Sequence, residues 1–169
     1  MAEGLATQVP SIARAYYRFE SGALGTDYLG NIPLTTGGGT PIETTGKYGG
    51  GIHFDGGTYL VSGGNSVSGP PFINGWWAAG WFKNFQGPVF SSKAGSYENY
   101  VGFNNTSIFA HVQSTTNVGF DANLTIPPGV NFDPTRYNHL AWVAAFHLVS
   151  FYLNGVLLAS YSKIGRAHV

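Results

Sequence analysis

Cysteine is absent from the 169-residue chain, which excludes disulfide bonds, thiolate metal sites and cysteine nucleophiles. Charge is also scarce. Asp, Glu, Lys and Arg together make up 9% of the residues, about a third of the usual share, and the formal net charge is zero. A neutral chain offers no electrostatic attraction to nucleic acid or to an anionic membrane, so we expect neither as a partner.

Long apolar runs are missing too. No stretch approaches the roughly 20 residues that a membrane-spanning helix needs, so membrane insertion is not expected. Residues 1–10 lack the basic start and apolar block of a signal peptide and form a lead without a clear pattern. We therefore expect a protein that is exported by another route, is part of a larger chain, or belongs to a virion. Its expected location is extracellular, on a cell surface or on a virion.

Glycine and aromatic residues are what the chain has in abundance. It contains 25 glycines, and Phe, Trp and Tyr make up 15% of the residues, whereas the helix formers Glu and Lys are few. Turn residues recur roughly every 8–12 positions, which is the spacing of short antiparallel strands in a sandwich or barrel. The sequence therefore predicts one all-β domain over residues 11–162, large enough for a sizeable core.

The clearest single element is a late hairpin in residues 139–161. The apolar runs LVSFYL and VLLASY flank Asn154-Gly155, and this dipeptide suits a type I′ turn, which needs positive φ at both central residues. Side chains alternate between the two faces of a strand. We therefore expect Val149, Phe151 and Leu153 to point into the core.

Other segments are assigned from the same signals. Residues 51–61 predict a hairpin that turns at Asp55-Gly56-Gly57. Residues 36–51, TGGGTPIETTGKYGGG, favour a surface loop, because they are rich in glycine and lack the context of a phosphate-binding loop. The remaining expected strands are residues 11–20, 32–35, 76–85, 99–103, 107–113 and 116–125.

Several motifs occur in a recognisable order. His139-Leu-Ala-Trp through Asn154-Gly155 fits the spacing of HHVAVTYDGSTLRLYVNG without a gap, GIHFDGGTYLV resembles ALXFDGXXDYV, and WWAAGWFKNF resembles FTISAWVKP. These are patterns of laminin-G-like domains, part of the concanavalin A-like lectin/glucanase superfamily, and the resemblance covers about residues 16–160. It implies a jelly-roll β-sandwich of two antiparallel sheets. The chain departs from the family at Ala145-Phe146-His147, where the family has a polar turn.

Residues 163–169, KIGRAHV, need separate treatment. They can be encoded by AAG ATC GGA AGA GCA CAC GTC, which resembles a widely used sequencing-library adapter. We interpret them as a non-native tail and exclude them from fold reasoning. If this interpretation holds, the natural protein continues past Ser162, and the further strand with which laminin-G-like domains usually end is missing from this sequence. The competing interpretation is an ordinary tail that matches through codon choice.

The superfamily includes glycosidases, whose two catalytic carboxylates lie about 5–9 Å apart. In the glucanases they share one strand in a Glu-x-Asp-type pattern, but no two acids of this chain are spaced at i, i+2 or i, i+4. The chain also lacks a Gly-x-Ser-x-Gly motif and a His pair at metal spacing. We therefore expect a non-catalytic module, with a glycoside hydrolase as the weaker alternative. The acidic residues are Glu3, Glu20, Asp27, Glu43, Asp55, Glu98, Asp121 and Asp133.

Carbohydrate binding is the function that the resemblance implies. Exposed aromatic side chains could supply it, because the apolar CH faces of sugars stack on aromatic rings. Alternation in residues 76–85 places Trp77 and Trp81 together on one face of the expected strand. The competing interpretation is that loops cover Trp81, which matches the family's recurrent tryptophan. The candidate sugar-binding residues are Trp77, Trp81, Tyr100, Asn104 and Tyr152, with Asn99 and Asn105 as further contacts.

Calcium is bound by some relatives through loop carboxylates and backbone carbonyls. Asp27 and Asp55 are the acids in the corresponding loops and therefore the candidate metal ligands. Turn capping, in which each carboxylate accepts nearby backbone N–H groups, is the first expectation for both. We expect no required cofactor, with Ca²⁺ as an optional ligand.

The alternative to a glycan is a protein ligand. Low charge and the missing signal peptide also suit an adhesion or assembly module of a virion, a cell surface or a large multidomain protein. The aromatic side chains would then anchor a protein interface. A lectin should be stabilised by sugar, whereas an assembly module should form concentration-dependent oligomers.

Overall fold

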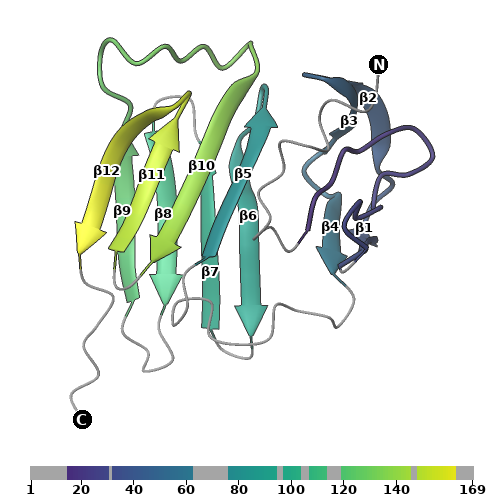
Figure 1. Cartoon of the computed structure of the whole chain (residues 1–169), viewed down its shortest axis with the longest axis horizontal. Coiled ribbons are helices and arrows are strands. Elements are labelled where there is room, and N and C mark those ends of the chain that lie inside the picture. Colours follow the sequence, from purple (N-terminus) through teal and green to yellow (C-terminus); the bar gives the residue numbers. More distant parts are fainter. Residues whose placement is uncertain are drawn as a thin grey trace. The chain divides into compact units, whose positions relative to one another are not determined.

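The computed structural model describes residues 15–30, 32–62, 76–94, 97–103, 107–113, 119–145 and 148–162. Within these ranges all regular structure is β, with twelve strands and no helix, so nothing in them is a helix that could cross a bilayer. The all-β prediction is confirmed. The chain forms two compact units, residues 1–68 and 69–169, which are coloured from purple to blue and from teal to yellow in Figure 1. The boundaries of the lead, the domain and the tail stay predictions, and residues 1–10 and 163–169 lie outside the described residues.

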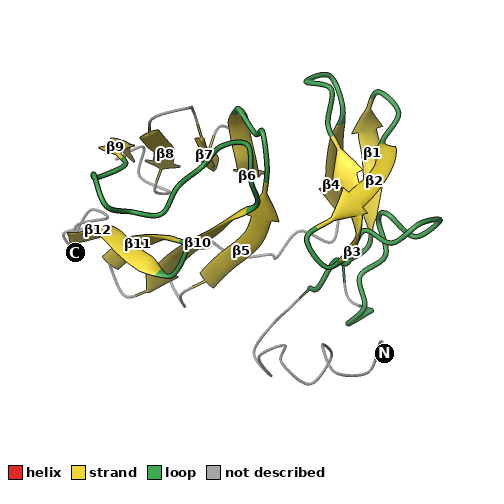
Figure 2. Ribbon diagram, turned by 90° about the horizontal axis from the view of Figure 1, so that it is seen from above, coloured by secondary structure: helices red, strands yellow, loops and turns green. Residues whose placement is uncertain are grey.

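The unit formed by residues 69–169 is a β-sandwich of two four-stranded antiparallel sheets, seen as two layers in Figure 2. One sheet has the order β12-β11-β10-β5, and the other has the order β6-β7-β8-β9. The first sheet contains β5 (Trp76–Phe82), β10 (Asn138–Ala145), β11 (Leu148–Leu153) and β12 (Val156–Ser162). The second contains β6 (Gly87–Ala94), β7 (Tyr97–Phe103), β8 (Ser107–Gln113) and β9 (Gly119–Thr125).

The core of this unit lies between the two sheets and is built from alternate residues of their central strands. Trp142 and Phe151 are its largest side chains, and their rings stack with centroids 6.1 Å apart. Removing this much apolar surface from water is the main term that favours the sandwich. The buried hydrophobic residues are Val101, Phe103, Ile108, Ala110, Leu140, Trp142, Val149, Phe151 and Leu153.

Next to its Asn-Gly turn, the late hairpin forms in the predicted register. Asn154 has a φ of 49° and Gly155 a φ of 82°, which is the pair of positive values that a type I′ turn needs, and Leu153 pairs with Val156 on either side of it. The predicted core face of β11 is confirmed. The sequence did not reveal a β-bulge opposite Phe151 and Tyr152, where the pairing shifts by one residue of β12.

The unit formed by residues 1–68 contains two small antiparallel sheets and corrects two predictions. β1 (Leu34–Gly38) pairs with β4 (Tyr59–Ser62), and β2 (Ile42–Gly46) pairs with β3 (Gly49–His53). The predicted surface loop over residues 36–51 was therefore wrong, because β-branched residues of β2 favour an extended hairpin. The predicted hairpin over residues 51–61 was also wrong, because β3 and β4 pair with different partners.

The first predicted strand is also corrected. Residues 11–14 lie outside the described residues, and residues 15–20 make only an isolated bridge between Tyr17 and Asp27. The Asp27 side chain supplies the hydrogen-bond acceptor that a neighbouring strand would otherwise provide, since Asp27 Oδ1 accepts the Tyr16 N–H at 2.8 Å. The Tyr17 hydroxyl donates to the Ile32 carbonyl at 2.5 Å, and burial, together with the nearby Asp27 charge, raises its pKa to about 12.

A pair of leucine variants tests the sandwich. Leu153 is fully buried and Leu157, on the neighbouring strand, is 51% exposed. Leu153→Ala should lower the free energy of unfolding by about 2–5 kcal/mol through lost burial and a residual cavity. Leu157→Ala should change it by no more than about 0.5 kcal/mol. Urea titration followed by circular dichroism measures both, and equal effects would contradict the assignment of the two faces.

Candidate functional site

The outward face of the β5–β10–β11 sheet brings three of the predicted aromatic residues together. On β5, Trp77 and Trp81 flank Ala79, and Ala79 pairs with Ala141 of β10. Ala141 in turn pairs with Tyr152 of β11. Because directly paired residues point to the same side of a sheet, the two alanines form a floor between the three aromatic side chains. We call this surface, formed by Trp77, Ala79, Trp81, Ala141 and Tyr152, the aromatic trough.

The two tryptophans of the trough are open to solvent. Trp77 is 38% exposed and Trp81 is 40% exposed, although large aromatic side chains are usually well buried. They are four residues apart on one strand, so their Cα atoms are separated by about 13 Å. The trough is therefore long enough for several sugar units rather than one.

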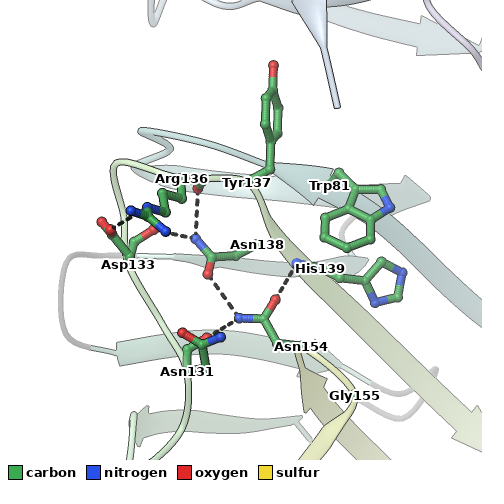
Figure 3. A pocket seen from close by; sticks show the side chains of 9 residues that line it. All are labelled: Trp81, Asn131, Asp133, Arg136, Tyr137, Asn138, His139, Asn154 and Gly155. Atoms are coloured by element: carbon green, nitrogen blue, oxygen red, sulfur yellow. Dashed lines mark hydrogen bonds and ion pairs between the residues drawn. The ribbon is translucent and has the colours of Figure 1, made fainter. Parts of the chain in front are cut away.

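At the Trp81 end the trough meets a depression of about 460 Å³ that is lined mainly by polar residues. His139 pairs with Trp81 across the strands, and the two rings lie 5.0 Å apart between centroids with a tilt of 56°. Figure 3 shows these two rings beside each other. The depression is lined by Trp81, Asn131, Asp133, Arg136, Tyr137, Asn138, His139, Asn154 and Gly155.

The amide of Asn154 connects the hairpin turn to this depression (Figure 3). Its Oδ1 accepts the His139 N–H at 2.8 Å. Its Nδ2 donates to Asn138 Oδ1 at 3.0 Å and also to the Asn131 carbonyl. We call this set of three hydrogen bonds the Asn154 hub. It fixes the backbone beneath His139, and so it holds the ring that contacts Trp81.

Asn138 extends the hub into the loop before β10. Its side chain is buried, and its Nδ2 donates to the carbonyls of Asp133 at 2.7 Å and Arg136 at 2.9 Å. The Asp133 carboxylate closes the same loop by accepting the Thr135 hydroxyl at 2.7 Å and the Thr135 N–H at 2.9 Å. These two hydrogen bonds, the hydroxyl one first, lower the pKa of Asp133. The amides thus shape the rim, and the Arg136 side chain is left exposed at its edge.

Tyr100 belongs to a different surface. It lies on β7, in the second sheet, where its ring stacks on His111 with centroids 5.3 Å apart and meets Phe109 edge-on at 6.0 Å. Neighbouring Val101 points into the core, so Tyr100 points away from the first sheet and from the two tryptophans. His111 also contacts Asp121 at 2.7 Å. Asn104 and Asn105 lie outside the described residues, as does the side chain of Asn99.

The two candidate metal ligands both cap turns. Asp27 is buried, and its Oδ1 and Oδ2 accept the N–H groups of Leu29 at 3.0 Å and Ile32 at 2.8 Å. Asp55 Oδ1 accepts the Thr58 hydroxyl at 2.8 Å and the N–H groups of Gly57 at 3.0 Å and Thr58 at 2.9 Å, and these bonds, the hydroxyl one first, lower the pKa of Asp55. In the part of the chain that the structure describes, no three His, Cys, Asp or Glu side chains gather as a metal site would require.

Sequence reasoning missed the polar residues of the depression. Asn154 was interpreted only as a turn residue, and its partners Asn131 and Asn138 lie 23 and 16 residues away in the chain. No periodic pattern links such positions. The sequence did contain one local signal, which is that several asparagines precede the expected hairpin and its turn itself begins with an asparagine.

No protein-family model matches the sequence, and no curated protein matches it. Among solved structures, the chain is similar to domain 4 of AbnA, a GH43 extracellular arabinanase from Geobacillus stearothermophilus, in complex with arabinotriose. The TM-score is 0.62 at 18% sequence identity, and the similarity covers 90% of this chain and 76% of that one. A likeness at this identity shows the fold alone, which is a β-sandwich.

The site predicts a pH dependence of stability. Burial lowers the pKa of His139 below the value of about 6.5 for a histidine in the unfolded chain. Below about pH 6.5 the unfolded chain therefore binds more protons at this position than the folded chain, and stability falls as pH falls. Urea midpoints measured between about pH 7.5 and pH 5 should show this slope.

His139→Gln should remove part of the slope, and His53→Gln, at an exposed position of the other unit, serves as the matched control. The tryptophan fluorescence of the chain should follow the same protonation, because the Trp81 ring lies against the imidazole. If His139→Gln left the slope and the fluorescence change intact, the assignment of this pH dependence to His139 would be contradicted.

Proposed function

We propose that this chain is a non-catalytic carbohydrate-binding module of the laminin-G-like type, with the aromatic trough as its glycan site. The observation that carries the proposal is the pair of exposed indoles, Trp77 and Trp81, on either side of a floor of alanines. A contiguous exposed apolar surface of this kind marks an interaction site. An extracellular, cell-surface or virion location follows from the same proposal.

The chemistry of the trough suits an oligosaccharide. The CH faces of sugar rings would stack on Trp77 and Trp81, and the alanine floor leaves room for the rings to lie flat. Hydroxyl groups would meet polar side chains at the Trp81 end, where Asp133 and Arg136 line the depression. The solved complex of AbnA domain 4 with arabinotriose makes an arabinose oligosaccharide the first ligand to test.

The arrangement of acidic groups supports a binding role over hydrolysis. A glycosidase needs two carboxylates about 5–9 Å apart across the scissile bond. Among the described residues that line the depression, Asp133 is the one carboxylate, and its oxygens are held by Thr135 and Arg136. Its lowered pKa keeps it ionised, which is unsuited to a general acid.

Binding is tested by isothermal titration of the full chain with arabinotriose and by a glycan array for other sugars. The Trp77→Ala plus Trp81→Ala variant should lose at least about 90% of the affinity, since aromatic anchors dominate such sites. Tyr100→Ala should bind as the unchanged chain does, because Tyr100 lies on the other sheet. Undiminished binding by the double tryptophan variant would eliminate the trough as the site.

A protein ligand is the second candidate, and one observation favours it. Leu148 and Leu157, which are 42% and 51% exposed, extend the apolar surface across β11 and β12. Such a surface is typical of a protein interface in an adhesion or assembly module. Sedimentation that shows concentration-dependent oligomers, together with no response to any glycan, would favour this function.

Calcium is a weaker proposal for the Asp27 and Asp55 turns. Because both carboxylates already accept N–H groups, we expect the melting temperature to be the same in calcium and in chelator. Asp27→Asn should destabilise the chain equally in both, since the loss is of hydrogen bonds to the ionised carboxylate. A calcium-dependent rise in melting temperature that Asp27→Asn or Asp55→Asn abolishes would instead establish a metal site.

A further inference from the structure

The Asn-Gly pair that suits the type I′ turn at Asn154 is also the pair most open to deamidation. It is the first residue of the type I′ turn, and it is followed by Gly155, whose missing side chain gives free access to its backbone nitrogen. In such a pair the Gly155 nitrogen can attack Asn154 Cγ. The new N–Cγ bond forms as the Cγ–Nδ2 bond breaks, and the Gly155 N–H proton leaves with the amide nitrogen as ammonia. Water then opens the succinimide to aspartate or isoaspartate.

The Asn154 hub opposes this attack. The amide must rotate until Cγ faces the following nitrogen, but its Oδ1 is held by the His139 N–H and its Nδ2 by two acceptors. The Asn154 N–H is also bonded to the His139 carbonyl at 2.8 Å. Rotation therefore requires several hydrogen bonds to open together, and each opened bond lowers the population of the reactive geometry.

We propose that Asn154 is a deamidation site that the hub holds unreactive in the folded chain. We further propose that deamidation breaks the hub irreversibly, because the product cannot form the same hydrogen bonds. The aspartate product has no Nδ2–H to donate. Its carboxylate oxygen would face Asn138 Oδ1 and the Asn131 carbonyl, which are both acceptors. The isoaspartate product adds a backbone atom to a two-residue turn, which changes the register that the turn sets.

The effect reaches the trough through His139, whose backbone the hub fixes and whose ring contacts Trp81. Only the consequence for glycan affinity rests on the proposed function. The chemistry at Asn154 and its effect on stability stand without it.

The test is incubation of the full chain at mildly alkaline pH, with and without urea, followed by peptide mass spectrometry. Asn74-Gly75, the other Asn-Gly pair of the sequence, reports the intrinsic chemistry in the same tube under urea. In urea the two pairs should react at similar rates. Without urea Asn154 should react at least about tenfold more slowly than in urea, the factor expected from opening several hydrogen bonds.

Two asparagine variants provide the matched comparison. Asn138→Ala removes an acceptor of Asn154 Nδ2, whereas Asn131→Ala leaves its acceptor in place, because Asn131 contributes its backbone carbonyl. Asn138→Ala should speed deamidation of Asn154 about fivefold in the folded chain, and Asn131→Ala should not. Equal rates for Asn154 with and without urea, or equal effects of the two variants, would overturn the proposal.

The Asn154→Asp variant isolates the product. Aspartate tolerates the positive φ of this position, so the turn itself is kept. The urea midpoint should fall and the tryptophan fluorescence should change. A midpoint equal to that of the unchanged chain would overturn the proposal that aspartate at this position breaks the hub. If deamidation behaves as proposed while the unmodified chain binds no glycan, the proposed function fails and this inference stands.

Discussion

The alternation of side chains on β5, β10 and β11 determines both the core and the outward face of the sandwich. Trp142 and Phe151 fill the space between the sheets, and this forces their neighbours Ala141 and Tyr152 to the opposite side. A slip of one residue would bury Tyr152 and expose Phe151. The packing of the core therefore determines where the trough lies, because it also orients the side chains on the outward face.

The Asn-Gly turn and its hub fix that alternation at one end. The turn sets how β11 meets β12, and the Asn154 amide binds the loop before β10 to the same point. The turn, the start of β10 and the loop before β10 thus share one anchor beside Trp81. The polar end of the trough is as well defined as its apolar floor, although loop residues build it.

The sequence predicted those parts of the fold where apolar and polar residues alternate on a packed strand. The faces of residues 77–82 and 148–153 follow directly from this pattern, because burial on one side penalises every other choice. Prediction from the same pattern failed in residues 36–61, because the glycines there have no side chain that could indicate a buried or an exposed face. Gly50 instead permits a close approach, since a Cβ there would lie 2.5 Å from the Phe19 carbonyl oxygen. Local patterns also could not predict that Tyr100 lies on a different sheet from Trp77 and Trp81, because the sheet to which a strand belongs depends on long-range pairing.

The bulge of β12 bears on how this fold can vary in length. Leu157, Leu158 and Ala159 stand opposite only Tyr152 and Phe151, so β12 contains one residue more than its partner at this point. A chain lacking one of these three residues could keep the same pairing before and after the gap. Relatives that lack one residue in the strand corresponding to β12 are therefore compatible with this sandwich, whereas the same deletion in β10 would turn the following side chains of that strand to the wrong face.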